Sequence, residues 1–171
     1  STYGIYNNTV YLNASSSGAN FGTTGIYHTR SATATTAVLD MRNNIIVNNS
    51  TPAGTGFTVA FRRSASTDLV NFGSSSNNND LYAGTPSVTN LIFYDGANSD
   101  QTMAAYKARV TPRDASSFST LPNFVNIAAA PYDLHINPAT ATQLESGGNT
   151  ISTPNINDDF DGNARYPNPG Y

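Results

Sequence analysis

The sequence predicts an all-β fold: a right-handed parallel β-helix with about three coils and a C-terminal capping extension that contains one short helix. Two observations lead to this prediction, namely short apolar segments bounded by turn-forming residues and a cassette of paired asparagines that recurs at a nearly fixed spacing. A β-sandwich is the alternative, because regularly spaced short strands are typical of that fold too. We expect the coils over residues 1–98, and the cap or extension of the same domain over residues 99–171.

The asparagine cassette occurs three times in the first half of the chain. Its copies are YNNTVYLN at 6–13, RNNIIVNN at 42–49 and NNNDLYAG at 77–84. The pairs that align these copies are Asn7-Asn8, Asn43-Asn44 and Asn78-Asn79, which are 36 and then 35 residues apart. Such a period indicates stacked repeats, because one unit cannot bury its apolar face alone whereas a stack can.

Two more strand-like segments belong to each period. The segments before the Asn pairs are TYGIY at 2–6, AVLDM at 37–41 and DLVNF at 68–72. The segments between the cassettes are GIYHT at 25–29 and GFTVAF at 56–61, with NLIFYDG at 90–96 expected as the next member. Three short strands per period, separated by Ser, Thr, Gly and Asn turns, indicate a coil.

Asparagine suits the bends of such a coil. It adopts the left-handed backbone region more readily than most residues that carry a Cβ, and its amide bonds to neighbouring backbone. Amides stacked at the same corner of successive coils can also bond to one another in a ladder. We therefore expect the Asn pairs at corners, where a ladder satisfies polar groups that a tight bend would leave without partners.

The second half begins with the one convincing helix of the sequence. In DQTMAAYKARV, the apolar residues with helical spacing are Met103, Tyr106 and Val110. Asp100 is the expected N-cap, and Pro112 ends the helix. The later segments do not repeat the cassette, as expected of a terminal unit that covers an exposed core.

The order of motifs after the helix resembles a known family. The motifs are PNFVN at 122–126, PYDLHINPAT at 131–140, ESGGN at 145–149 and DDFDGNARY at 158–166. In this order they are similar to the C-terminal part of secreted bacterial right-handed parallel β-helix surface proteins, which are pectate-lyase-like solenoids. ATATQLESGG stands where that family has S-P-A-I-D-A-G, and the chain stops at PGY. The resemblance implies an extracellular or cell-surface protein, and the strand-like start leads us to expect a piece or processed product of a longer one.

Composition excludes several classes of function. Only 11% of the residues are charged, the formal net charge is −3 and Lys107 is the single lysine, so a basic surface for nucleic acid is not expected. The absence of cysteine excludes disulfides and thiolate metal sites. No apolar run is long enough to insert into a membrane. The expected partners are surface glycans, or other copies or domains of the parent protein.

No motif predicts a catalytic residue or a cofactor. A polysaccharide lyase or hydrolase would need paired carboxylates, or a carboxylate with a metal and a base. Asp40 and Asp68 are the candidate pair, because both precede an Asn cassette and could lie on one face of the stack. Solvated surface acids are the favoured interpretation of both, since no convincing base is near.

The acidic cluster NDDFDGN at 157–163 suggests calcium as the one possible cofactor. Oxygen-bearing residues followed by glycine resemble a calcium loop, and the candidate ligands are Asp158, Asp159 and Asp161. The cluster lacks the distal glutamate of an EF-hand, so a turn closed by an Asp pair with Arg165 is favoured. The two histidines, His28 and His135, are expected to be surface or cap residues and not a metal site.

Strand tyrosines suggest how such a protein could bind sugars. They are Tyr6, Tyr11, Tyr27, Tyr82 and Tyr94. An exposed row would stack on sugar rings, although packing in or between coils is the commoner fate of strand aromatics. The favoured function is a non-catalytic structural or adhesive module with a glycan-binding face. The alternatives are a polysaccharide lyase or hydrolase, and a subunit of an extracellular fibre assembled end to end through unpaired strand edges.

Overall fold

Segments rich in β-branched and aromatic residues form short strands, so that the chain is mostly β, with several sheets. The computed structural model describes residues 1–64 and 68–164. The coil-region strands within these residues are β1 (Thr2–Tyr6), β2 (Thr9–Leu12), β3 (Thr23–His28), β4 (Val38–Arg42), β5 (Ile45–Asn48), β6 (Thr58–Arg63), β7 (Asp80–Tyr82) and β8 (Asn90–Tyr94).

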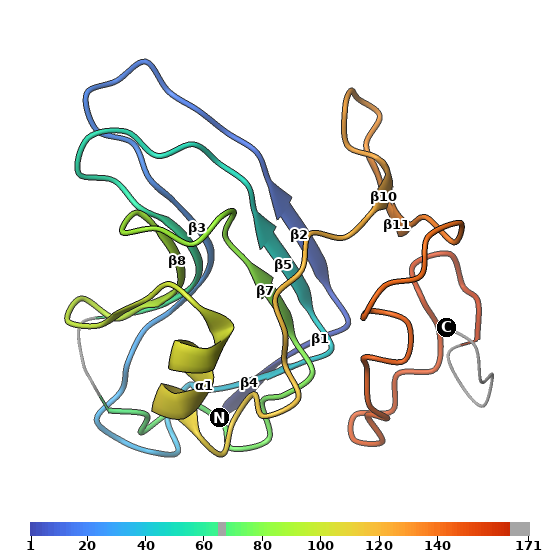
Figure 1. Cartoon of the computed structure of the whole chain (residues 1–171). Helices are drawn as coiled ribbons and strands as arrows, with labels where there is room; N and C mark the ends of the chain where they lie inside the picture. Colours follow the sequence, from blue (N-terminus) through green and yellow to red (C-terminus); the bar gives the residue numbers. More distant parts are fainter. Residues whose placement is uncertain (65–67, 165–171) are drawn as a thin grey trace.

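The strands form three groups of parallel neighbours. β1 pairs with β4, β5 lies between β2 and β7, and β6 lies between β3 and β8. After β3 the chain returns so that β4, β5 and β6 lie beside β1, β2 and β3, as Figure 1 shows. The three predicted classes of segment therefore each pair among themselves. In the first class, however, the segment at 68–72 forms no strand and pairs only through a single bridge between Phe72 and Leu39 of β4. This pairing is parallel, whereas the sheets of a β-sandwich are antiparallel.

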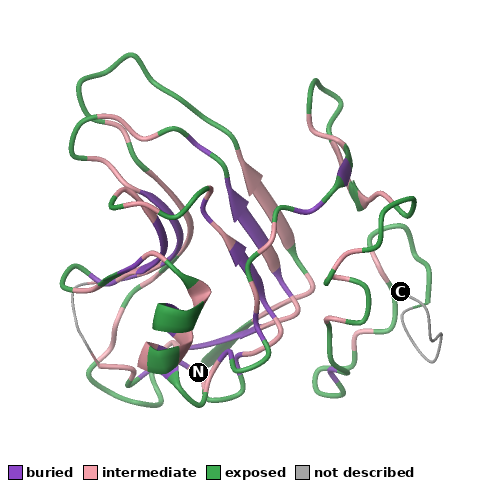
Figure 2. Cartoon of the chain, viewed as in Figure 1, coloured by how far each residue is buried: buried purple, intermediate pink, exposed green. Residues whose placement is uncertain are grey.

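Side chains from all three groups of strands meet in one core. Met41 of β4, Ile46 of β5 and Phe61 of β6 are fully buried members of this core. The ring centroid of Phe61 lies 5.2 Å from that of Phe72 and 5.6 Å from that of Phe93. Burying each such side chain contributes about 1.5–3 kcal/mol. Figure 2 shows the buried residues concentrated on these strands.

The predicted hydrogen bonds between asparagine amides are present. Asn8 Nδ2 donates to Asn44 Oδ1 at 3.3 Å, and Asn44 Nδ2 donates to Asn79 Oδ1 at 2.9 Å. We call these three residues and Asp114, which ends the series, the amide row. In a parallel series, Asn43 Nδ2 donates to Asn7 Oδ1 at 3.1 Å. The first residue of each Asn pair has a positive φ, at 55°, 56° and 58° for Asn7, Asn43 and Asn78.

Asp114 continues the amide row 35 residues after Asn79. Its Oδ1 accepts from Asn79 Nδ2 at 2.9 Å and from Ser117 Oγ at 2.6 Å. Its Oδ2 accepts from the hydroxyl of Tyr106 at 2.6 Å, and both Asp114 and Tyr106 are fully buried. The strand hydrogen bonds continue as well, since Phe118 pairs in parallel with Asp80 of β7.

One helix, α1 (Met103–Val110), forms where the sequence predicts it, and buries Tyr106 and Val110. The predicted N-cap was wrong: Thr102 caps the helix, accepting from the Ala105 amide at 3.3 Å. Asp100 lies instead in β9 (Ser99–Asp100), antiparallel to β8, and its carboxylate binds the Arg109 guanidinium at 2.5 Å. Strand pairing therefore holds Asp100 away from the helix start.

The rest of the chain runs along the outside of the β2–β5–β7 sheet (Figure 1). This C-terminal extension, residues 119–164, contains β10 (Phe124–Asn126) and β11 (Asp133–Ile136), which are antiparallel. The ring of Phe124 meets that of Tyr11 edge-on, with centroids 5.7 Å apart. No helical segment within the described residues combines the length and apolar character of a membrane span.

Candidate functional site: an aromatic and arginine face

The outer face of the β3–β6–β8 sheet carries two tyrosines with an arginine between them. Tyr27 of β3 pairs in register with Arg62 of β6, which pairs with Tyr94 of β8. Neighbouring strands are about 4.8 Å apart, so the three side chains form a row across the sheet. Residues one position earlier, among them Phe61 and Phe93, fill the core. We call this row the aromatic–arginine face.

The two rings hold the guanidinium of Arg62. Its Cζ lies 5.7 Å from the Tyr27 ring centroid and 5.2 Å from that of Tyr94, which are cation–π distances. The side chain of Arg62 makes no hydrogen bond or ion pair with any residue that the structure describes, and its Nε is buried without a partner. Tyr27 is 57% exposed, so much of its surface remains available to solvent.

A shallow groove of about 350 Å³ lies beside this row. Its lining residues are Gly22, Thr23, Thr24, Thr55, Gly56, Phe57, Arg62 and Tyr94. The rings of Phe57 and Tyr94 pack with centroids 5.1 Å apart. Hydroxyls, aromatic rings and one cation thus converge in a groove without a carboxylate.

Close approach of two loops builds one wall of the groove. A Cβ on Gly56 would lie 1.8 Å from the carbonyl oxygen of Phe21, and a Cβ on Gly22 would lie 2.7 Å from the Phe57 amide nitrogen. Glycine is therefore required at both positions for the loops to lie against each other. The pair Phe21 and Ala53 joins the same loops by an antiparallel bridge.

The other large outer face is covered. On the β2–β5–β7 sheet, Val47 is fully buried although it alternates with the core residue Ile46, and Asp80 is 1% exposed. The C-terminal extension lies over this face (Figure 1). Of the two faces, the aromatic–arginine face is the one that the extension leaves open.

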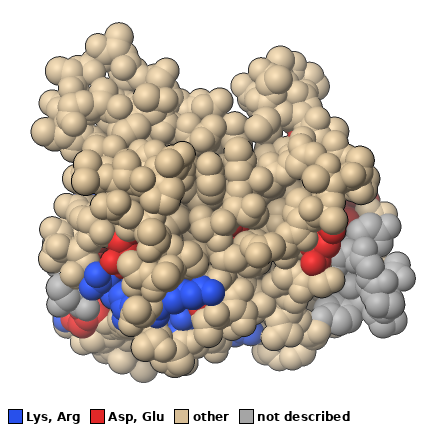
Figure 3. Space-filling model, in the orientation of Figure 1, with Lys and Arg blue, Asp and Glu red and all other residues tan. Residues whose placement is uncertain are grey.

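Charge is sparse over the surface in Figure 3. Lys and Arg side chains gather at the lower left of that view, in the part of the molecule where α1 lies. Lys107 and Arg109 belong to the last turn of this helix. Most of the remaining surface in the view is neutral.

Asp40 and Asp68, the candidate catalytic pair, are engaged by different arginines. Asp40 accepts from the Tyr6 hydroxyl at 2.9 Å and binds the Arg42 guanidinium at 2.5 Å. Asp68 binds Arg30 at 2.5 Å. Because Leu39 pairs with Phe72, the strand register places Gly73, not Asp68, beside Asp40. The two acids are therefore not at equivalent positions of successive strands.

The candidate calcium ligands lie in a turn at the end of the described chain. Asp159 Oδ1 accepts from the amides of Asp161 and Asn163, at 2.9 and 2.8 Å. Asp158 pairs with Ala164 in an isolated bridge. Among the described residues, no group of three or more acidic, His or Cys side chains is arranged to hold a metal ion. Arg165, the predicted partner of this turn, lies outside the described residues.

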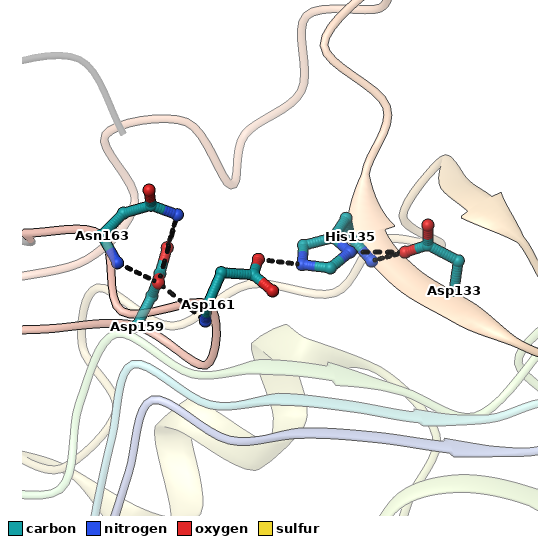
Figure 4. A network of polar contacts seen from close by, with 5 residues as sticks. All are labelled: Asp133, His135, Asp159, Asp161 and Asn163. Atoms are coloured by element: carbon teal, nitrogen blue, oxygen red, sulfur yellow. Dashed lines mark hydrogen bonds and ion pairs between the residues drawn. The ribbon is translucent and has the colours of Figure 1, made fainter.

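His135 joins the turn to β11 (Figure 4). Its Nε2 lies 2.7 Å from Asp161 Oδ2, and its Nδ1 lies 2.5 Å from Asp133 Oδ1. Hydrogen bonds to Asp133 and Asp161 raise the pKa of His135, and the hydrogen bond from the His135 amide is the main reason that the pKa of Asp133 is lowered. We call these three residues the His135 clasp. His135 and Asp161 were considered separately from sequence, but their contact depends on the fold.

His28 occupies a different setting, at the end of β3. Its Nε2 lies 3.0 Å from the Ala37 carbonyl oxygen and 3.2 Å from Asn71 Nδ2. Burial lowers the pKa of His28. It is a half-buried structural residue within the coil region, far along the chain from the His135 clasp.

Asp80 is an acid with a shifted pKa, and its burial was not predicted from the sequence. Its Oδ1 accepts from the Thr120 amide at 2.8 Å, while its Oδ2 is buried without a partner among the described residues. Burial raises the pKa of Asp80 to about 7. The residue lies where the C-terminal extension leaves the coil region.

Comparison with known proteins finds no matching family model, no similar curated protein and no similar solved structure.

Proposed function

We propose that this chain is a non-catalytic adhesive module of a secreted, cell-surface protein, and that it binds glycans along the aromatic–arginine face. The observation that carries the proposal is the row of Tyr27, Arg62 and Tyr94 beside a polar groove. Flat aromatic rings stack on the apolar faces of sugars, while nearby hydroxyls and a guanidinium bond to sugar oxygens. The role as a surface protein rests on the family resemblance of the C-terminal motifs.

The scaffold that we propose for this module is a right-handed parallel β-helix of about three coils. Parallel partners such as Thr9 and Ile45, or Ile45 and Asp80, are 36 and 35 residues apart, close to one coil of chain. Connections between parallel strands of one sheet are right-handed in nearly all proteins. Such a scaffold repeats a side-chain position from coil to coil, which is how a row across a sheet arises.

The engagement of the acidic candidates supports a non-catalytic role. A general acid or nucleophile must be available to the substrate, whereas Asp40 and Asp68 each bind an arginine. The aromatic–arginine face carries no carboxylate of its own. A binding role uses what this face offers, namely rings, hydroxyls and one cation.

The proposal is tested by affinity electrophoresis in gels that contain neutral polysaccharides: dextran, soluble starch, xylan and hydroxyethyl cellulose. We expect at least one polymer to retard the wild-type protein, without release of reducing sugar. The double variant Tyr27→Ala, Tyr94→Ala should bind the polymer at least about tenfold more weakly than the wild type. A tenfold loss of affinity corresponds to about 1.4 kcal/mol of lost stacking. Tyr132→Ala, which alters a 64% exposed tyrosine of the extension, is the matched control. Retardation of wild type and double variant to the same extent would refute the role of this face.

A second function, end-to-end assembly, is favoured by one observation. In the described residues, β1, β2 and β3 each have a strand partner on one side only. Their other edges present backbone N–H and C=O groups to which another chain could pair. Light scattering over a range of protein concentrations should then show growth of assemblies, and a monomer at every concentration would exclude this function.

A further inference from the structure

We infer that the ligand of the aromatic–arginine face carries an anionic group, a carboxylate or a sulfate on a sugar, and that the guanidinium of Arg62 binds it. This inference rests on the proposed function and names the class of glycan that the same face selects. The juxtaposition that carries it is a cation held between two aromatic rings, beside a groove of hydroxyls, with no acceptor among the described residues.

Arg62 differs from the other described arginines in its polar contacts. Each of the others makes a hydrogen bond or an ion pair: the partners are Asp68 for Arg30, Asp40 for Arg42, Asn71 for Arg63, Asp100 for Arg109 and the Phe72 carbonyl for Arg113. Arg62 has neither kind of partner among the described residues. In a chain with few charges, the fold therefore positions the Arg62 cation without giving it a polar partner among the described residues.

The two tyrosine rings restrain the position of the Arg62 guanidinium. Tyr27 and Tyr94 flank it at 5.7 and 5.2 Å from their centroids. Its Nε is buried, whereas its two terminal nitrogens are not among the buried atoms without a partner. A guanidinium presents paired N–H groups that match the two oxygens of a carboxylate or sulfate. Because stacking already restrains the side chain, binding such a group orders little that was free.

The groove residues around Arg62 also favour an anionic ligand. None of the described residues that line the groove is acidic, so no carboxylate of the groove lining competes for Arg62. Thr24 lines the groove, and its hydroxyl makes no hydrogen bond to any described residue. A sugar ring stacked beside Arg62 would place its hydroxyls over this groove. The face therefore combines the contacts that a charged sugar needs.

Three polymers with one backbone test the inference: dextran, carboxymethyl-dextran and dextran sulfate. In affinity electrophoresis at low salt, we expect carboxymethyl-dextran, dextran sulfate or both to bind the wild-type protein about tenfold more tightly than dextran, the size of effect expected for a charge-assisted hydrogen bond. The comparison between the two charged polymers decides between carboxylate and sulfate. Added salt should weaken this preference, because screening reduces the attraction.

Variants assign the preference to one residue. Arg62→Gln should lose the preference, so that it binds the charged polymers no more tightly than it binds dextran. Lys107→Gln removes the same charge from α1, outside the groove, and is the control, which should keep the preference. Arg62→Lys retains charge but loses the flat paired donors, and should give an intermediate preference. Thermal unfolding checks that each variant is folded, and Arg62→Lys with the salt series replaces Arg62→Gln if that variant does not fold.

The outcomes separate the two proposals. Equal binding of dextran and both charged polymers, or an unchanged preference in Arg62→Gln, overturns the anionic ligand while glycan binding stands. A preference that Lys107→Gln abolishes also overturns it, since overall charge would then be responsible. If none of the three polymers is bound, the inference is overturned, and the neutral panel decides the proposed function separately.

Discussion

The coil region, residues 1–118, and the C-terminal extension, residues 119–164, are held in different ways. In the coil region, strands pair in register, buried amides bond to one another and a continuous core lies between the sheets. The extension has one two-stranded sheet, several turns and exposed apolar side chains such as Tyr132 and Phe160. Figure 2 shows this difference in burial. Stability should therefore decrease from coil to extension, because local unfolding follows the amount of buried contact.

The extension is attached to the coil region at a few points. Asn43 Nδ2 donates to the Asn149 carbonyl at 2.7 Å, and Asn78 Nδ2 donates to the Gly147 carbonyl at 2.9 Å. The same asparagines that turn the corners of the coil thus also bind the extension. The ring contact between Tyr11 and Phe124 and the hydrogen bond of Thr120 to Asp80 add further points.

The largest effect should come from breaking the amide row. In Asn44→Ala, the Asn8 amide loses an acceptor and the buried Asn79 Oδ1 loses a donor, so unfolding should become easier by about 2–4 kcal/mol. Asn49→Ala, at an exposed position that makes no side-chain hydrogen bond to the described residues, should change stability by less than about 0.5 kcal/mol. Chemical denaturation measures both, and equal effects of the two variants would show that the row does not stabilise the coil.

An intermediate effect on stability is expected at Asp80, where the C-terminal extension leaves the coil region. The pKa of folded Asp80, about 7, lies above its ordinary value of 3.8, so the folded state retains the proton longer than the unfolded state. The free energy of unfolding should therefore fall as pH rises from about 4 to about 7, and this contribution is constant above that range. Asp80→Asn cannot titrate, so the stability of the variant relative to wild type should rise by roughly 2 kcal/mol between pH 5 and pH 8.

Denaturation of wild type and Asp80→Asn at several pH values measures this difference. Glu145→Gln provides the control, because Glu145 is an exposed acid of the extension that is not part of the His135 clasp. A stability difference between wild type and Asp80→Asn that stays constant from pH 5 to pH 8 would contradict the raised pKa of Asp80.

The smallest effect should be in the extension, at the His135 clasp. The raised pKa of His135 means that its contribution to stability is complete below the ordinary value of 6.5 and is lost as pH rises through the folded value. The lowered pKa of Asp133 means that its contribution is lost as pH falls through its folded value. The ion pairs of the His135 clasp therefore form at pH values between the folded-state pKa of Asp133 and that of His135.

Removing the clasp should act locally. His135→Ala should change global stability by less than about 0.5 kcal/mol, because these ion pairs are exposed to solvent. Hydrogen exchange should nevertheless become faster in the amides of residues 158–164, and the wild type should show the same change at high pH. Tyr132→Ala is the control. Unchanged exchange in His135→Ala would mean that the clasp does not hold the turn.

Much of the coil region could be predicted from local sequence rules. Paired asparagines favour left-handed bends and amide bonding, and their 36- and 35-residue spacing placed β2, β5 and β7 side by side. The helix followed from the spacing of Met103, Tyr106 and Val110. The N-cap did not, because Asp100 is held by strand pairing, a contact that local preference does not include.

The candidate site was only partly predictable. Tyr27 and Tyr94 were among the strand tyrosines considered for a sugar-binding row, but the sequence did not separate them from Tyr11, which packs on the extension. Arg62 was visible only as one of two adjacent basic residues. The strand register sends Arg62 outward between two rings, whereas Arg63 is buried and bonds to Asn71. One position along a strand reverses the face to which a side chain belongs.

The sequence by itself determined the elements that depend on neighbouring residues: the short strands, their turns, the asparagine corners and the helix. Only the tertiary structure decided which functional side chains lie next to one another. Asp114 continues the amide row without an Asn pair, Asp80 is buried at the junction, and Arg62 lies between Tyr27 and Tyr94. The physical reason is that these environments are made by residues far apart in the chain, which come together only when one length of chain stacks on another.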